Sequence, residues 1–172
     1  MNVPYLDLSV RDKSLKKDLL DAVDQVLSHG RVVLGPEISE FEELIAEICG
    51  RKYAVGVSSG TDALYVSLIS LGIGPGDEII TTPMSWIATV NAIVLTGATP
   101  VFVDVRTDLN IDTERIVEAI TPRTKAILPV HYTGNICDMY TICSVADEHG
   151  LLVIEDAAQA FGAKSRYGIA GS

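Results

Sequence analysis

The sequence has few cysteines and no excess of basic residues, and each shortage argues against a class of protein. Its 172 residues include three cysteines, Cys49, Cys137 and Cys143, and no pair of them has CxxC spacing. None of the three histidines clusters with them, so neither a disulfide framework nor a structural zinc or other metal site is expected. Thirteen Lys and Arg residues against 23 Asp and Glu residues give a formal net charge of -10. This balance argues against nucleic acid or an anionic membrane surface as a partner.

Long apolar runs are also missing. No stretch approaches the roughly 18 uninterrupted apolar residues that a membrane span requires. The N-terminus lacks the basic start and apolar run that are typical of a secretory signal. We therefore expect a cytoplasmic protein. The 48% apolar and 21% charged residues are typical of a folded domain, and the length is close to that of one domain.

The remaining pattern alternates helix-like and strand-like segments. Two amphipathic helices are predicted first, over about 14–29 and 36–49, with Pro36 in the first turn of the second. Apolar runs then predict strands buried on both faces, at 53–57, 78–81, 100–103, 126–130 and 151–154. Helical segments separate them, at 61–71, 85–95, 112–120 and 138–149. The order predicts an α/β fold, with a mostly parallel sheet and helices on both faces.

Ligands of parallel sheets bind beyond the carboxyl ends of the strands, so the residues there are the candidates for a site. After the first predicted strand, Ser58-Ser59-Gly60-Thr61 leads into a helix. The free N–H groups of such a turn suit a phosphate monoester. Alternatively, Ser59 or Thr61 is a plain N-cap with nothing bound. No GxxxxGK[ST] motif is present, and the glycines of LGIGPGDEII precede a strand, so Rossmann and P-loop nucleotide sites lose support.

Two acids close the last predicted strand. Asp156 is the usable one if the neighbouring Glu155 points to the other face of the sheet. A carboxylate at this edge can bind a metal, act as a base, pair with a cation on a ligand, or cap the segment AAQAF. Metal binding has little support, because no second acid or histidine lies at ligand spacing.

Trp86 and His131 follow two further strands at the same edge. The indole of Trp86 can stack on a flat cofactor or lie in the core. His131 can line a pocket or only hydrogen-bond the backbone. These alternatives stay open when each residue is considered singly.

Taken together, the edge segments resemble a known family. VSSGTDALYVSL, TTPMSWIATVNAI, PVFVDV followed by NID, ILPVHYTG and VIEDAAQAFGA occur in the order and spacing of the DegT/DnrJ/EryC1/StrS sugar aminotransferases. The resemblance implies a fold type I enzyme that uses pyridoxal 5′-phosphate. It also implies that Gly60 and Thr61 hold the phosphate, Trp86 stacks on the pyridine ring and Asp156 pairs with the ring nitrogen. The remaining transfers place Gln159 beside the cofactor's hydroxyl face and match His131 to a pocket-lining histidine.

The resemblance also implies what lies outside this sequence. The family's Schiff-base lysine follows the Asp–Gln segment, so it is expected beyond Ser172, together with the C-terminal small domain. Residues 1–172 are then the N-terminal part of the cofactor-binding large domain, preceded by helices over about 14–49, and inactive alone. The polar tail 164–168 is expected to lead to another element.

The parent is expected to be a homodimer that aminates a nucleotide-linked keto sugar, with glutamate or glutamine as the amino donor, in polysaccharide or antibiotic biosynthesis. Alternatives are a sugar dehydratase of the same family, driven by pyridoxamine phosphate, or a catalytically incompetent truncated chain with an assembly role. The residue at the downstream lysine position separates the aminotransferase from the dehydratase.

Overall fold

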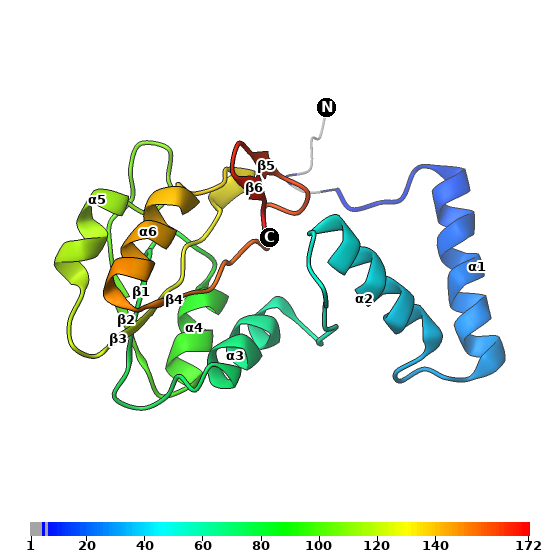
Figure 1. The fold of residues 1–172 in the computed structure, drawn as a ribbon. Coiled ribbons are helices and arrows are strands. Elements are labelled where there is room, and N and C mark those ends of the chain that lie inside the picture. The colour runs from blue at the N-terminus through cyan, green and yellow to red at the C-terminus, as the bar shows by residue number, and fades with distance from the viewer. Residues whose placement is uncertain (1–4, 6) are drawn as a thin grey trace.

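Two helices precede an α/β body in the computed structural model, which describes Tyr5 and residues 7–172 (Figure 1). Helix α1 (Lys13–His29) begins after Asp12, whose side chain accepts hydrogen bonds from the N–H groups of Ser14 and Leu15. It ends at Gly30, which has a left-handed φ of 71°. Helix α2 (Pro36–Ile48) begins with Pro36 at a first-turn position, as predicted. Both helices match their predicted ranges to within one residue.

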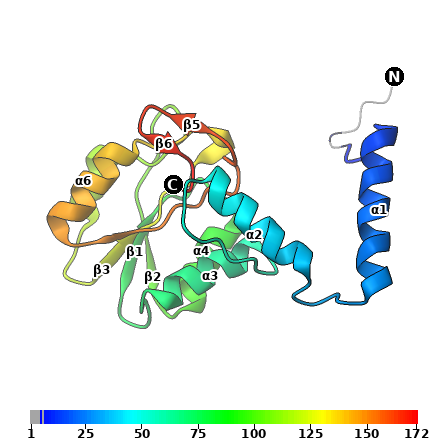
Figure 2. The same ribbon diagram turned by 45° about the vertical axis from the view of Figure 1, so that its right-hand side comes forward.

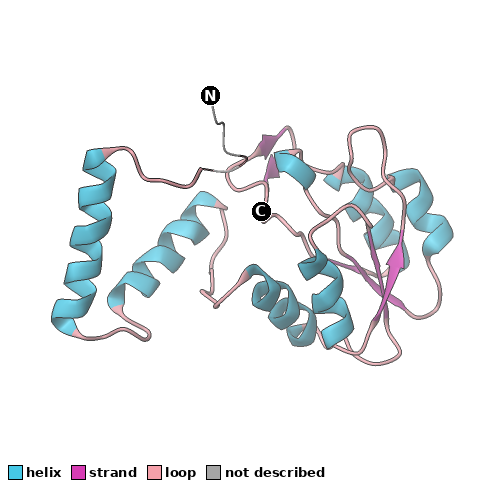
Figure 3. Cartoon of the chain, turned by 180° about the vertical axis from the view of Figure 1, so that it is seen from behind, coloured by secondary structure: helices cyan, strands magenta, loops and turns pink. Residues whose placement is uncertain are grey.

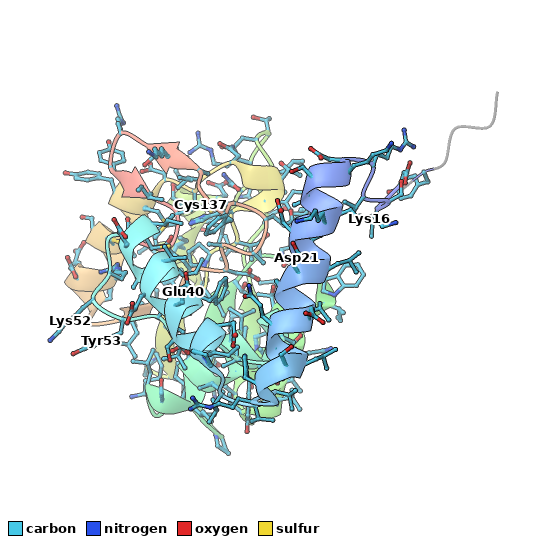
Figure 4. The ribbon with its side chains drawn as sticks, turned by 90° about the vertical axis from the view of Figure 1, so that its right-hand side faces the viewer. Lys16, Asp21, Glu40, Lys52, Tyr53 and Cys137 are labelled. Carbon is cyan, nitrogen blue, oxygen red and sulfur yellow. The ribbon has the colours of Figure 1, made fainter. Side chains whose placement is uncertain are left out.

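The apolar stripes of these two helices are uncovered in the described part of the chain. Helix α1 contains no buried residue, and Leu15, Leu19 and Leu27 are exposed. In α2 only Ala46 is buried. Figures 1 and 2 show α1 as the outermost element, and Figure 4 shows Lys16 and Asp21 projecting from it. The amphipathic pattern therefore predicted the helices correctly, although neither packs its stripe into the core of the body.

The body is built on a four-stranded parallel sheet. Its strands are β1 (Glu78–Thr81), β2 (Thr99–Phe102), β3 (Thr124–Ile127) and β4 (Leu152–Val153). Their order is β2-β1-β3-β4, and every pairing is parallel. The carboxyl ends of all four strands therefore meet at one edge. This confirms the predicted α/β class and parallel sheet.

Helices cover both faces of this sheet (Figure 3). Helices α3 (Gly60–Ser70) and α4 (Ile87–Leu95) pack on one face, in a core cluster that includes Leu68 and Ile79. Helices α5 (Thr113–Ile116) and α6 (Met139–His149) pack on the other, with a short 3-10 helix (Val117–Ala119) after α5, around Ile80 and Ile127. The adjacent residues Ile79 and Ile80 are fully buried on opposite faces, which explains the unbroken apolar run of β1.

Two sequence predictions about strands are wrong. Residues 53–57 form no strand, and Tyr53 and Val55 are exposed. The reason is that no described strand pairs with this segment, and the Gly56 N–H donates instead to the Glu42 Oε1 at 2.6 Å. Burial on both faces holds only for the central strands, because β2 and β4 lie at the sheet edges and are partly exposed.

The tail also differs from the prediction of a polar connection. Residues 164–169 form an antiparallel hairpin of β5 (Lys164–Ser165) and β6 (Gly168–Ile169). Within the turn, the Ser165 Oγ accepts a hydrogen bond from the Tyr167 N–H at 3.1 Å. The ring of Tyr167 stacks on Tyr140 of α6, with centroids 5.4 Å apart. Among the described residues, no helix has the length and apolar character needed to cross a membrane.

Candidate functional site

A cleft of about 340 Å³ opens at the carboxyl edge of the sheet. It is bounded by the start of α3, the loop and first turn that lead into α4, the residues after β3 and the turn after β4. Five of the six residues predicted as cofactor-binding line it, namely Gly60, Thr61, Trp86, Asp156 and Gln159. These residues lie up to 99 positions apart in the chain (159 minus 60). Trp86, Asp156 and Gln159 meet because the parallel strands before them end together, and Gly60 and Thr61 join them because α3 packs beside α4 on the sheet.

The start of α3 lines this cleft. The Ser59 Oγ accepts from the Asp62 N–H at 3.1 Å, so the N-cap interpretation of Ser59 is confirmed. The N–H groups of Gly60 and Thr61 find no acceptor in the part of the chain that the structure describes. A hydrogen bond from Ser58 holds the pKa of Asp62 below its ordinary value, and a second from Ser59 acts in the same direction. Because the N–H groups of Gly60 and Thr61 are unpaired, these two donors and the positive end of the helix dipole are available to an anion.

Trp86 stands at the rim of the cleft, immediately before α4. Its side chain is not part of the core, since Trp86 is 74% exposed. The core interpretation of this residue is therefore wrong. An exposed indole at the rim of this cleft offers a flat apolar face on which a planar ligand can stack.

Asp156 also lines the cleft and is only 8% exposed. Its Oδ2 accepts a hydrogen bond from the Thr89 hydroxyl at 2.6 Å, and its Oδ1 accepts from the Ala158 N–H at 3.3 Å. No Lys, Arg or His of the described residues forms an ion pair with it. Residues 157–160 form a turn, so Asp156 does not cap a helix there. A nearly buried carboxylate without a counter-ion is costly, and a cationic ligand relieves that cost.

His131 is separated from the other candidates. It is fully buried, and its Nε2 lies 2.8 Å from the Glu155 Oε2. Its Nδ1 accepts from the Cys137 N–H at 3.3 Å, so the ring proton resides on Nε2 and is donated to Glu155. Both ring nitrogens are engaged, and His131 does not line the cleft. Of the two alternatives for His131, lining a pocket or bonding the backbone, its Nδ1 takes the second.

Glu155 faces away from the cleft, as the alternation of strand side chains predicts. Burial raises the pKa of Glu155, but the hydrogen bonds from His131 and from the Gly171 N–H outweigh burial and hold it below its ordinary value. The carboxylate thereby ties the end of β4 to the residues after the hairpin. Glu155 thus has a structural partner on each side, whereas Asp156 has no charged partner.

Gln159 completes the cleft with an amide. Its Oε1 accepts a hydrogen bond from the Thr133 N–H at 2.8 Å. Thr133 belongs to a short 3-10 helix (Tyr132–Gly134) and has a left-handed φ of 57°, which is uncommon for a β-branched residue. The amide Nε2 of Gln159 has no acceptor among the described residues and remains available as a donor.

Sequence reasoning missed Ser85 and Thr89. Ser85 lines the cleft, and its hydroxyl lies 2.6 Å from that of Thr89. The signal that points to the pair is their spacing of four residues at the start of a predicted helix, which places both on one face. No group of three or more His, Cys, Asp or Glu residues suited to a metal occurs in the described chain. All six lysines are exposed, and none lines the cleft.

Comparisons with known proteins identify the family of the chain. The DegT/DnrJ/EryC1/StrS aminotransferase family matches residues 13–171. The UDP-2-acetamido-2-deoxy-3-oxo-D-glucuronate aminotransferase of Pseudomonas aeruginosa is 43% identical over 163 residues, which are 94% of this chain and 45% of that protein. The chain thus spans less than half the length of this relative.

Two solved structures extend the comparison to the fold. The crystal structure of DesV from S. venezuelae matches with a TM-score of 0.95 and 46% identity, over 99% of this chain and 46% of that one. The structure of ntda from Bacillus subtilis, with the cofactor PMP bound, matches with a TM-score of 0.86 and 40% identity, over 88% of this chain and 35% of that one. The chain belongs to the DegT/DnrJ/EryC1/StrS aminotransferase family, and its fold is that of the fold type I transferases.

Proposed function

We propose that residues 1–172 are the N-terminal part of the cofactor-binding large domain of a sugar aminotransferase. In this proposal the cleft binds pyridoxal 5′-phosphate and its amino form, and the whole protein transfers an amino group to a nucleotide-linked keto sugar. Support comes from the family match and from a relative whose name describes an aminotransferase of a UDP-linked keto sugar.

One observation carries the proposal, namely that the unpaired carboxylate of Asp156 lines the same cleft as the free N-terminus of α3. The cleft offers two unpaired N–H donors at Gly60 and Thr61, an exposed indole at Trp86, and a nearly buried carboxylate. A ligand that satisfies all three is flat, has a phosphate at one end and carries a positive charge on its ring. The phosphorylated pyridine cofactor has these properties, so the residues present fit it.

Each residue then has a separate task. When bound, the pyridine ring supplies a sink for the electron pair released when the substrate's Cα–H bond breaks. Asp156 keeps the ring nitrogen protonated, because a nearby negative charge favours the cationic form. Gly60 and Thr61 hold the phosphate, and Trp86 covers one face of the ring and keeps water away. Gln159 donates from its Nε2 toward the hydroxyl side of the ring.

The nucleophile is proposed to come from outside residues 1–172. A Schiff-base lysine needs a desolvated environment to be reactive near neutral pH, and every lysine of this chain is exposed. We therefore propose that this chain binds the cofactor weakly and has no transaminase activity alone. The small domain, the choice of glutamate or glutamine as donor, and assembly as a homodimer belong to the same proposal for the whole protein.

The proposal is tested by measuring binding of pyridoxamine 5′-phosphate, which needs no lysine. Calorimetric titration of the purified protein is expected to give saturable binding, and dephosphorylated pyridoxamine is expected to bind at least tenfold more weakly because it lacks the anion for the α3 N-terminus. Inorganic phosphate should compete. Equal binding of the two compounds, or no binding at all, contradicts the proposal.

The substrate class is tested on the full-length protein. Conversion of a UDP- or dTDP-linked keto sugar to the amino sugar, with glutamate or glutamine as donor, is followed by mass spectrometry. An increase of mass consistent with replacement of a carbonyl by an amine is expected. Loss of water from the sugar without nitrogen incorporation supports the dehydratase instead.

A further inference from the structure

A chain of two hydroxyl groups leads from the wall of the cleft to Asp156. The Thr89 Oγ1 lies 2.6 Å from the Asp156 Oδ2, and the Ser85 Oγ lies 2.6 Å from the Thr89 Oγ1. Thr89 is fully buried, whereas Ser85 is partly buried and lines the cleft. Both hydroxyls belong to the segment that enters α4, and Asp156 follows β4, so the contact joins two elements that are distant in sequence.

The carboxylate of Asp156 determines which hydroxyl donates in this series of hydrogen bonds. An ionised carboxylate only accepts hydrogen bonds, so the Thr89 hydroxyl donates to Asp156. Its oxygen then accepts the Ser85 proton, and the Ser85 oxygen keeps its lone pairs free. Two donors, Thr89 and the Ala158 N–H, therefore hold the two oxygens of the carboxylate in one orientation.

Thr89 has an easier alternative that it does not use. A threonine within a helix commonly bonds the backbone carbonyl three or four residues earlier. Here its hydroxyl contacts a side chain 67 positions away in sequence. Hydrogen bonds to charged groups are stronger than those between neutral groups, and the stiff χ1 of a β-branched residue fixes the donor in place.

We infer that Thr89 is a positioning residue, supported by Ser85, which orients the Asp156 carboxylate toward the ring nitrogen of the bound cofactor. The inference rests on the proposed function, because it assigns Thr89 a role through the Asp156–ring contact. It adds that the ion pair depends on a group that does not itself line the cleft.

The test compares two ligands in three variants. The ligands are pyridoxamine 5′-phosphate and its 1-deaza analogue, in which C–H replaces the ring nitrogen, so that only the first pairs with Asp156. Thr89→Val removes the hydroxyl and keeps the shape, and Thr89→Ser keeps the hydroxyl. Thr81→Val is the matched control, since Thr81 is also fully buried but donates to the Leu128 carbonyl at 2.8 Å.

Thr89→Val is expected to raise the Kd for pyridoxamine 5′-phosphate about tenfold and to leave the Kd for the deaza analogue within about twofold. For Thr89→Ser, both Kd values should stay within about threefold of the wild type. Thr81→Val should leave the Kd for each ligand unchanged. Equal weakening of both ligands by Thr89→Val, or no weakening, overturns the inference while leaving the proposed function intact. Wild-type protein that binds neither ligand instead overturns the proposed function, and the inference with it.

A second variant keeps the test decisive if Thr89→Val does not fold. Ser85→Ala removes the donor to Thr89 but leaves the Thr89–Asp156 bond in place. It is expected to weaken only pyridoxamine 5′-phosphate, by about threefold. Weakening of both ligands to the same extent assigns Ser85 a direct contact with the ligand and contradicts its supporting role.

Discussion

Replacing Asp156 by Asn removes one charge from the cleft while preserving the size of the side chain. The amide oxygen still accepts from the Thr89 hydroxyl, which keeps the shorter hydrogen bond at 2.6 Å, and the longer one from the Ala158 N–H at 3.3 Å is lost. Two unit charges about 4 Å apart attract by about 4 kcal/mol at an effective dielectric constant of about 20, and by about 1 kcal/mol in bulk water. Because Asp156 is only 8% exposed, its attraction for a cation lies nearer the first value. We expect a loss of about 3 kcal/mol, or more than a hundredfold in affinity.

The measurement is the Kd for pyridoxamine 5′-phosphate, together with thermal unfolding of the ligand-free protein. Asp156→Asn should bind at least about a hundredfold more weakly yet unfold at a temperature no lower than the wild type, since a nearly buried charge has been removed. Asp112→Asn is the matched control, because Asp112 caps α5 away from the cleft and Asn caps equally well. The reasoning is refuted if Asp156→Asn binds the ligand within about threefold of the wild type.

Three further predictions concern the fold around the site. Leu68→Ala, in the core between α3 and the sheet, should lower the free energy of unfolding by about 2 to 5 kcal/mol in urea denaturation, and a loss below about 1 kcal/mol contradicts the packing. Because the pKa of Glu155 is lowered in the folded state, its contribution to stability is present at neutral pH and is lost as the pH falls below the ordinary glutamate value. Glu155→Gln should therefore reduce the fall in the free energy of unfolding at acidic pH, and an unchanged fall excludes Glu155 as its cause. Burial raises the pKa of the Cys137 thiol to about 12, so an alkylating reagent at pH 8 should label Cys137 only after unfolding, as peptide mass mapping checks, and early labelling of this residue contradicts its burial.

The sequence contained most of the information needed for the fold. The spacing of apolar residues and the capping residues predicted the bounds of α1, α2, α3, α4 and α6 to within about two residues. These helices carry local signals such as Pro36 and Gly30. The segment 53–57 was mispredicted because apolar runs indicate strands only where a neighbouring strand pairs with them. The hairpin at 164–169 was missed because its strands are two residues long and have no apolar pattern.

The candidate site was predictable to the extent that topology alone brings residues together. Trp86 and Asp156 each follow a strand of the parallel sheet, which places both at one edge. Gly60 follows no strand and reaches the same cleft because α3, which it begins, packs beside α4 on the sheet. The engagement of His131 by Glu155 and Cys137 depends on side-chain packing between segments, which leaves no trace in residue spacing. The same holds for the bond between Thr89 and Asp156.

Glu155 and Asp156 are neighbours whose carboxylates serve opposite sides of the same backbone, one at the hairpin and the other at the cleft. A deletion of a single residue within β4 rotates this arrangement by half a strand repeat and exchanges the two side chains. Glu155 then no longer reaches the Gly171 N–H, and Asp156 no longer reaches Thr89. The number of residues in this segment therefore matters as much as their identity, because each acid reaches its own side of the backbone only in this register.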